Sequence, residues 1–201
     1  MDSRSTNDLE DINTVTQAVG KLGNAAQFTA ANSERLRIAD NAALSMGDID
    51  FTIACWVYLD SETAARPIVA KWNTANFEYK LEYRNAADRF VFSVSQTGAV
   101  GVDVTANNLG AVSSATWYFI VCWHDAAGNT INIQVNDGTA DSTSHTLGVR
   151  DGTSDFMLGM DQSASTFMDG RIDSVSVWKE LLSAAEKTWL YNAGNGREYP
   201  F

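Results

Sequence analysis

The sequence predicts an all-β protein: two antiparallel sheets stacked as a sandwich, with one short C-terminal helix. Three observations lead to this fold class. About a dozen short apolar or alternating segments follow one another with turn signals between them, a pattern typical of antiparallel sandwiches. Only the segment 183–194 has a helical pattern. Strands do not alternate with helices, as they would in a parallel sheet.

The expected strands are bounded by residues that favour turns, such as Met46-Gly47 and Asp151-Gly152. In chain order they cover residues 27–28, 36–38, 50–59, 68–71, 77–84, 89–95, 100–105, 116–124, 130–136, 142–146, 156–159 and 171–178. The clearest pair is the hairpin of 116–124 and 130–136, because apolar residues alternate in both strands and Ala-Ala-Gly-Asn at 126–129 supplies the turn.

The C-terminal helix has a start signal and a stop signal. Ser183 is positioned to cap the free amides, and Glu186 three residues later completes a capping box. Gly194 is expected to end the helix, because glycine adopts the left-handed conformation without strain.

Length and composition fit one folded domain. The chain has 201 residues, of which 45% are hydrophobic and 19% charged, which is not a disordered profile. Residues 1–24 are polar and predict an N-terminal arm or the remnant of an edge strand, so the sandwich is expected to occupy residues 25–201.

The net charge of −11 disfavours binding to nucleic acid or to an anionic membrane surface. The acidic surface can be explained by solubility alone. A more specific alternative is that the protein works in a cation-rich setting or binds calcium. The sequence contains no apolar run long enough for a membrane span, and its first eight residues lack the order of a signal peptide. Cys55 and Cys122 lie in apolar strands, which favours free thiols over a cross-sheet disulfide.

Catalytic patterns are weak. Glu78 and Glu82 share one side of a strand but lie about 13 Å apart, too far for a glycosidase pair. Lys80 stands between them, so a solvated face of alternating charge is expected. Neither His124 nor His145 has the spacing of a catalytic triad or a metal site. The protein is therefore not expected to be an enzyme.

Two loops combine an aromatic ring with amide or carboxylate groups, as sugar recognition requires. The candidate ligand-binding residues are Trp72, Asn73 and Asn76 in the first loop and Asp161, Gln162 and Phe167 in the second. In the alternative interpretation, Trp72 and Phe167 cover the open ends of the sandwich.

Several segments together resemble the laminin-G-like, concanavalin-A-like jelly-roll family. They are residues 25–28, 34–38, 50–57, 68–71, 116–119, 131–136 and 170–173. The resemblance spans about residues 20–195. It implies a jelly-roll β-sandwich that binds ligands at a rim or on one sheet, and it brings both candidate loops toward one rim.

The resemblance also implies a structural Ca²⁺ ion, with Asp173 as the leading ligand and Asn32 as a companion. In the alternative, Asp173 accepts hydrogen bonds from backbone amides or pairs with Arg171.

These observations favour a non-enzymatic carbohydrate-binding or adhesion module, located on an extracellular surface or in a virion as part of a larger assembly. The alternative is a structural decoration or cement subunit that binds neighbouring protein chains or further copies of itself. A glycoside hydrolase ranks last, because the paired carboxylates are missing.

Overall fold

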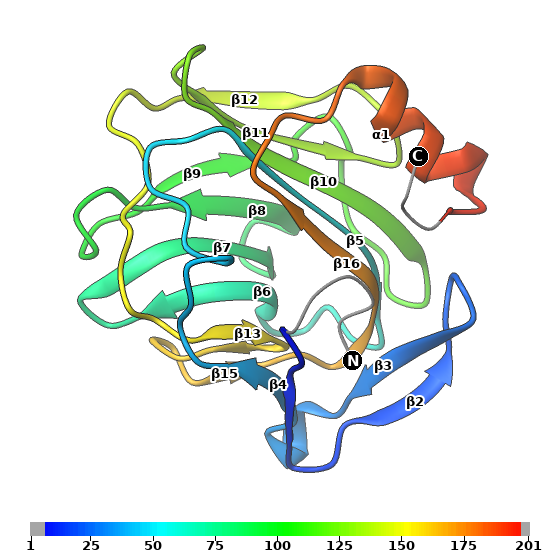
Figure 1. Cartoon of the computed structure of the whole chain (residues 1–201). Helices are drawn as coiled ribbons and strands as arrows, with labels where there is room; N and C mark the ends of the chain where they lie inside the picture. The colour runs from blue at the N-terminus through cyan, green and yellow to red at the C-terminus, as the bar shows by residue number, and fades with distance from the viewer. Residues whose placement is uncertain (1–6, 198–201) are drawn as a thin grey trace.

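Two seven-stranded antiparallel sheets pack face to face in the computed structural model, which describes residues 7–197 (Figure 1). Sheet A contains, in spatial order, β1 (Glu10–Ile12), β4 (Arg35–Ile38), β13 (Phe156–Leu158), β6 (Arg66–Asn73), β7 (Asn76–Arg84), β8 (Arg89–Val94) and β9 (Val102–Thr105). Sheet B contains β12 (Asp141–Ser144), β11 (Thr130–Val135), β10 (Trp117–Asp125), β5 (Phe51–Leu59), β16 (Gly170–Trp178), β3 (Asn24–Phe28) and β2 (Thr16–Val19). The predicted all-β, two-sheet fold is confirmed.

Smaller elements complete the chain. A two-stranded ribbon of β14 (Met160–Asp161) and β15 (Thr166–Phe167) packs against β6. The helical elements are α1 (Ala184–Tyr191) and two short 3-10 turns, η1 (Ala30–Asn32) and η2 (Asn192–Gly194). Among the described residues no helix has both the length and the apolar character that a membrane span needs.

The core lies between the sheets and is built from alternate side chains of each strand. Phe51, Ile53 and Cys55 of β5 enter it, together with Ile120 and Cys122 of the neighbouring strand β10. Both cysteines are free and buried, as the sequence predicted. Because the expected hairpin pairs His124 with Ile131 and Ile120 with Val135, its predicted turn is also correct.

The N-terminal segment is incorporated into both sheets over its described part. Residues 10–12 form β1, which pairs with β4 at one edge of sheet A, and residues 16–19 form β2, which pairs with β3 at one edge of sheet B. Neither strand was predicted separately from the sequence. Residues 1–6, the beginning of the expected arm or remnant, lie outside the described residues.

The helix begins as predicted but ends earlier. Ser183 accepts a hydrogen bond from the amide of Glu186, and the Glu186 carboxylate accepts one from the Ser183 amide. The expected stop at Gly194 is wrong, because Asn192 already adopts the left-handed conformation at φ 49°. Asparagine tolerates this conformation better than most residues, so it can end a helix as glycine does.

Gly170 starts β16 where this strand joins β3 to β5. Its φ is +141°, and a Cβ atom there would lie 2.1 Å from the Tyr58 carbonyl oxygen. We expect Gly170→Ala to lower the free energy of unfolding by roughly 3 kcal/mol or more, measured by denaturant titration. Gly110→Ala is the control: it has φ +84° but open space around the position, so it should cost only about 1 kcal/mol. Equal losses of unfolding free energy in both variants would contradict a steric clash between the added Cβ atom and the Tyr58 carbonyl.

Candidate functional site

The two loops that the sequence selected meet on the outer face of sheet A. Tyr79 and Leu81 of β7 enter the core, so Lys80 between them faces outward. The Lys80 Nζ atom lies 2.7 Å from Asp161 Oδ2 and 5.2 Å from the centroid of the Trp72 ring. Trp72 from the first loop and Asp161 from the second are therefore brought together around one lysine.

Trp72 is only 7% exposed. Phe77, its partner across the β6–β7 pair, stacks on one face of the indole with 4.4 Å between ring centroids and 4° between planes. Lys80 lies over the ring as well, and Gly101 approaches its edge. A sugar could stack on Trp72 only after these neighbours moved, so the geometry favours a packing role for Trp72 over ligand binding.

The remaining candidate residues have separate surroundings. Asn73 is exposed and its side chain accepts a hydrogen bond from the Thr74 amide. Asn76 donates to Thr153 and accepts from Arg150, which ties the β6–β7 turn to the segment that precedes β13. Gln162 and Phe167 are half-buried. Because these polar groups are spread along the rim, they do not converge on one ligand position.

The outer face of sheet A is an ion network and not the solvated face that the sequence predicted. Lys80 and Glu82 are 8% and 5% exposed, respectively. Lys80 bonds Glu82 at 3.1 Å, and Arg84 bridges Glu82 and Asp103 at 2.8 Å and 2.7 Å. Burial alone would raise the pKa of Asp103, but hydrogen bonds from Arg84 and Ser93 outweigh it and lower this pKa. Local alternation could not reveal this arrangement, because the β14–β15 ribbon that brings Asp161 to Lys80 comes from a distant part of the chain.

Glu78 lies in a β-bulge and is fully buried. The β6–β7 register pairs Lys71 with Tyr79 and Trp72 with Phe77, so Glu78 has no cross-strand partner. Its Oε1 atom lies 3.3 Å from Lys71 Nζ, whereas its Oε2 atom has no hydrogen-bond partner. Burial raises the pKa of Glu78 to about 7, although Lys71 partly offsets this effect.

The two residues expected to bind calcium have protein partners of their own. Asp173 accepts hydrogen bonds from the Leu22 amide at 2.8 Å and the Ser174 hydroxyl at 3.1 Å. The Asn32 side chain donates to Glu34 at 2.8 Å. Within residues 7–197, no group of three or more His, Cys, Asp or Glu side chains could hold a metal ion. Asp173 and Asn32 are thus each engaged with protein groups, and calcium binding stays a prediction.

An aromatic and polar row crosses the outer face of sheet B, and we call it the outer row. Strand register places its members side by side on five neighbouring strands: Trp117, Tyr58, Arg171, Gln27 and Thr16. Four of these side chains are half-buried and Thr16 is exposed, so each keeps part of its surface accessible.

Contacts along the outer row fix the orientation of its side chains. The Tyr58 and Trp117 ring centroids are 5.4 Å apart, and the Arg171 guanidinium lies 4.6 Å from the Tyr58 centroid. Arg171 Nε donates to Gln27 Oε1 at 2.9 Å, and Gln27 Nε2 donates to the exposed carboxylate of Asp60 at 3.0 Å. The row thus offers rings, an amide, a guanidinium and a carboxylate within one continuous strip.

Trp117 lies at an open end of this face. Pairing of β10 with β11 begins at Ile120, so Trp117 extends beyond the last partner residue of β11. Helix α1 covers the neighbouring rings Trp56 and Phe119, with Tyr191 stacked against both. No sequence pattern singled out Trp117, Tyr58, Arg171 and Gln27 as a group, because only long-range register unites them.

Comparisons with known proteins support the fold. A family model described as the concanavalin A-like lectin/glucanases superfamily matches residues 24–186. A comparison with curated proteins found no significant match. The chain is similar to the binding domain of Paraclostridial Mosquitocidal Protein 1, with TM-score 0.75 and 17% identity over 94% of this chain and 48% of that one.

Two further solved structures have the same fold. The binding domain of botulinum neurotoxin serotype G has TM-score 0.72 and 13% identity, covering 95% of this chain and 48% of that one. Domain 4 of AbnA, an extracellular GH43 arabinanase from Geobacillus stearothermophilus solved with arabinotriose, has TM-score 0.61 and 14% identity, covering 92% and 82%. The chain thus spans about half the length of the two toxin binding domains.

The environment of Glu78 predicts an unusual pH dependence of stability. Its pKa of about 7 in the folded protein exceeds the ordinary value of 4.5, so ionisation opposes folding. The contribution of this group is favourable below about pH 4.5 and is lost as the pH rises toward 7. Glu78→Gln should remove this loss, which amounts to at most about 3 kcal/mol. Urea unfolding of both proteins at pH 5 and pH 8.5 measures the difference; the same pH slope in both would contradict the assignment.

The burial of Trp72 predicts that its removal affects stability first. Trp72→Ala should lower the free energy of unfolding by about 3 to 5 kcal/mol, because it leaves a cavity beside Phe77 and Lys80. Asn73→Ala, at the exposed neighbouring position, should stay within about 0.5 kcal/mol of the parent. If Trp72→Ala is as stable as the parent but loses glycan binding, the ring is a ligand platform after all.

Proposed function

The chain belongs to the concanavalin A-like lectin/glucanases superfamily, and we propose that it is a non-enzymatic module that binds a neutral glycan on the outer row. The observation that carries this proposal is the accessible pair of rings, Tyr58 and Trp117, next to Arg171 and Gln27. An aromatic face packs against the apolar face of a sugar, and fixed polar groups select its hydroxyls.

Charge favours a neutral ligand. Arg171 and Asp60 balance one another within the strip, since both bond Gln27. The whole chain carries a net charge of −11, which repels acidic glycans at long range. The contacts among Arg171, Tyr58 and Gln27 also hold the row in place before a ligand arrives, which reduces the entropy lost on binding.

The carboxylates of sheet A support a binding role over a hydrolytic one. Glu82 and Asp161 both bond Lys80, and Glu82 and Asp103 both bond Arg84. A glycosidase needs one carboxylate free to act as acid and another as base or nucleophile. In this network each of the three is bound to a cation.

The relatives support a binding role of the fold, with ligands of different chemistry. The arabinanase domain was solved with arabinotriose, the cell entry of botulinum neurotoxin type C is described as dependent on interaction with two ganglioside molecules, and the binding domain of botulinum neurotoxin DC was solved in complex with rat synaptotagmin II. A place on an extracellular surface or in a virion fits such a module.

The structural-subunit alternative rests on one feature. Val19 in the edge strand β2 is 77% exposed, and an open strand edge can accept a strand from a neighbouring chain. In a decoration or cement subunit, this edge would hold another protein or a second copy of the chain in place of a glycan.

We expect Trp117→Ala to abolish binding on an array of neutral glycans that includes arabino-oligosaccharides, while its circular dichroism and unfolding midpoint stay close to those of the parent. Trp123→Ala is the matched control, because Trp123 is a half-buried ring at the other end of the same face, beneath Lys187. Parallel arrays with Ca²⁺ and with chelator test calcium dependence. No binding by the folded parent, or equal binding by Trp117→Ala, would overturn the proposal.

A further inference from the structure

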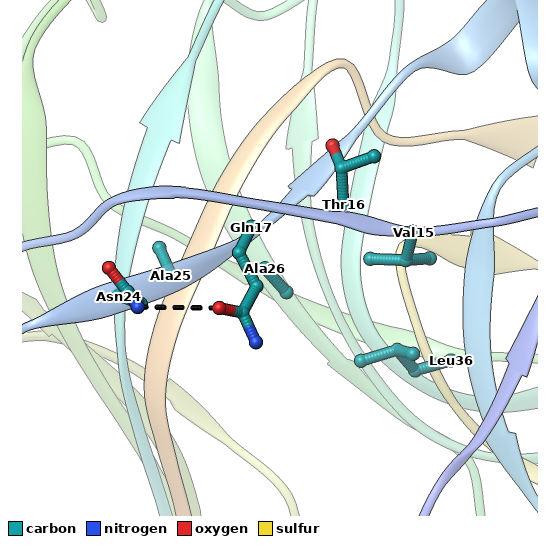
Figure 2. A pocket seen from close by; sticks show the side chains of 7 residues that line it. All are labelled: Val15, Thr16, Gln17, Asn24, Ala25, Ala26 and Leu36. Atoms are coloured by element: carbon teal, nitrogen blue, oxygen red, sulfur yellow. Dashed lines mark hydrogen bonds between the residues drawn. The ribbon is translucent and has the colours of Figure 1, made fainter.

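A cleft opens at the edge of the sandwich, between the β2–β3 hairpin of sheet B and β4 of sheet A (Figure 2). In Figure 1 this hairpin projects at the lower right of the molecule. The cleft has a volume of about 200 Å³. It is lined by Val15, Thr16, Gln17, Asn24, Ala25, Ala26 and Leu36.

The cleft has an apolar side and two amides. Val15, Ala26 and Leu36 pack against the core and supply the apolar side. The side chains of Gln17 and Asn24 are exposed, and Asn24 Nδ2 donates to Gln17 Oε1 at 3.3 Å (Figure 2). This distance is at the long end of the hydrogen-bond range, so a ligand hydroxyl can replace the bond at small cost.

The lining indicates the chemistry of the occupant. All seven lining residues are uncharged, so the cleft has no group to pair with a charged ligand. A small, neutral molecule with one apolar face and several hydroxyls matches an aliphatic surface beside two amides. A sugar residue has this character.

The cleft and the outer row meet at Thr16. This residue lines the cleft and is also the register partner of Gln27 at the end of the row. In Figure 2 its side chain points away from Val15 and Leu36, toward the other side of the strand. Between the two surfaces lies β2, the last strand of sheet B, whose outer edge pairs with no other strand of residues 7–197.

We propose that the outer row and the cleft form one extended site for a linear neutral oligosaccharide, which crosses the edge of β2 and places one sugar residue in the cleft. The inference rests on the proposed glycan-binding function and specifies its ligand as a chain of several residues. The five strands of the row span about 19 Å, so a disaccharide covers only part of it and a longer chain reaches Thr16 and the cleft.

Calorimetric titration of the whole chain with neutral oligosaccharides, from disaccharide to hexasaccharide in arabinan, xylan and glucan series, tests this proposal. We expect affinity to rise roughly tenfold with length in one series. The double variant Gln17→Leu/Asn24→Leu should lose this rise but keep the affinity of the parent for the disaccharide. Gln96→Leu/Asn107→Leu is the matched control, because both residues are exposed amides outside the cleft and the row.

A spectroscopic measurement keeps the test independent of the variants. In the parent protein, the hexasaccharide should shift the side-chain amide signals of Gln17 and Asn24 together with the Trp117 indole signal, whereas the disaccharide should shift only the indole. Binding that depends on Trp117 but not on length, or a length effect unchanged in Gln17→Leu/Asn24→Leu, would overturn the extended site and leave the proposed function intact. No binding in any series would overturn both.

Discussion

The structure depends on the burial of both faces of strand β5 in the middle of sheet B. Its inward residues Phe51, Ile53 and Cys55 form the core, but Ala54 and Trp56 on its other face are also buried. An apolar outer face must be covered, because leaving a large aromatic side chain in water forfeits about 2 kcal/mol or more. Helix α1 provides this cover through Leu190, together with Leu182 just before the helix. Because α1 packs on Trp56 and Phe119, only rings nearer the ends of β5 and β10 stay uncovered by the helix.

The outer face of sheet A is covered by ion pairs, whereas that of sheet B is covered by apolar side chains. Lys80, Glu82 and Asp161 are all nearly buried, and each is ion-paired. Taking such groups out of water is costly, so the network adds little net stability but makes the loss of any one partner expensive. The network positions the chain specifically, because the ion pair of Lys80 with Asp161 fixes the β14–β15 ribbon against the sheet. The same pairing occupies the carboxylates of Glu82 and Asp161.

Local signals in the sequence predicted most of the fold, because they depend on neighbouring residues only. The capping box of Ser183 and Glu186 and the turn between β10 and β11 are of this kind. The site was harder to predict. Burial of Trp72 requires Phe77 across a bulged strand pair, and the accessibility of Trp117 follows from where β11 ends. Neither fact is encoded by the residues next to the tryptophan. The aromatic residues therefore predicted a binding surface, but their sequence positions could not tell a packed ring from an open one.

The same reasoning explains why we propose recognition at one end of β5 and β10 and along the row to β2, rather than where α1 packs on the sheet. Central rings are needed to seal the contact with α1, so a ligand could reach Trp56 only by displacing Tyr191. Among the described residues β2 has no strand partner on its outer edge, and exposed Val19 makes this edge a place where another chain could pair. In the proposed site, a glycan that crosses this edge would supply hydroxyls to these backbone groups while its apolar faces meet Tyr58 and Trp117. Such binding would add contacts that the folded chain does not already make, whereas binding under α1 would have to undo contacts that folding requires.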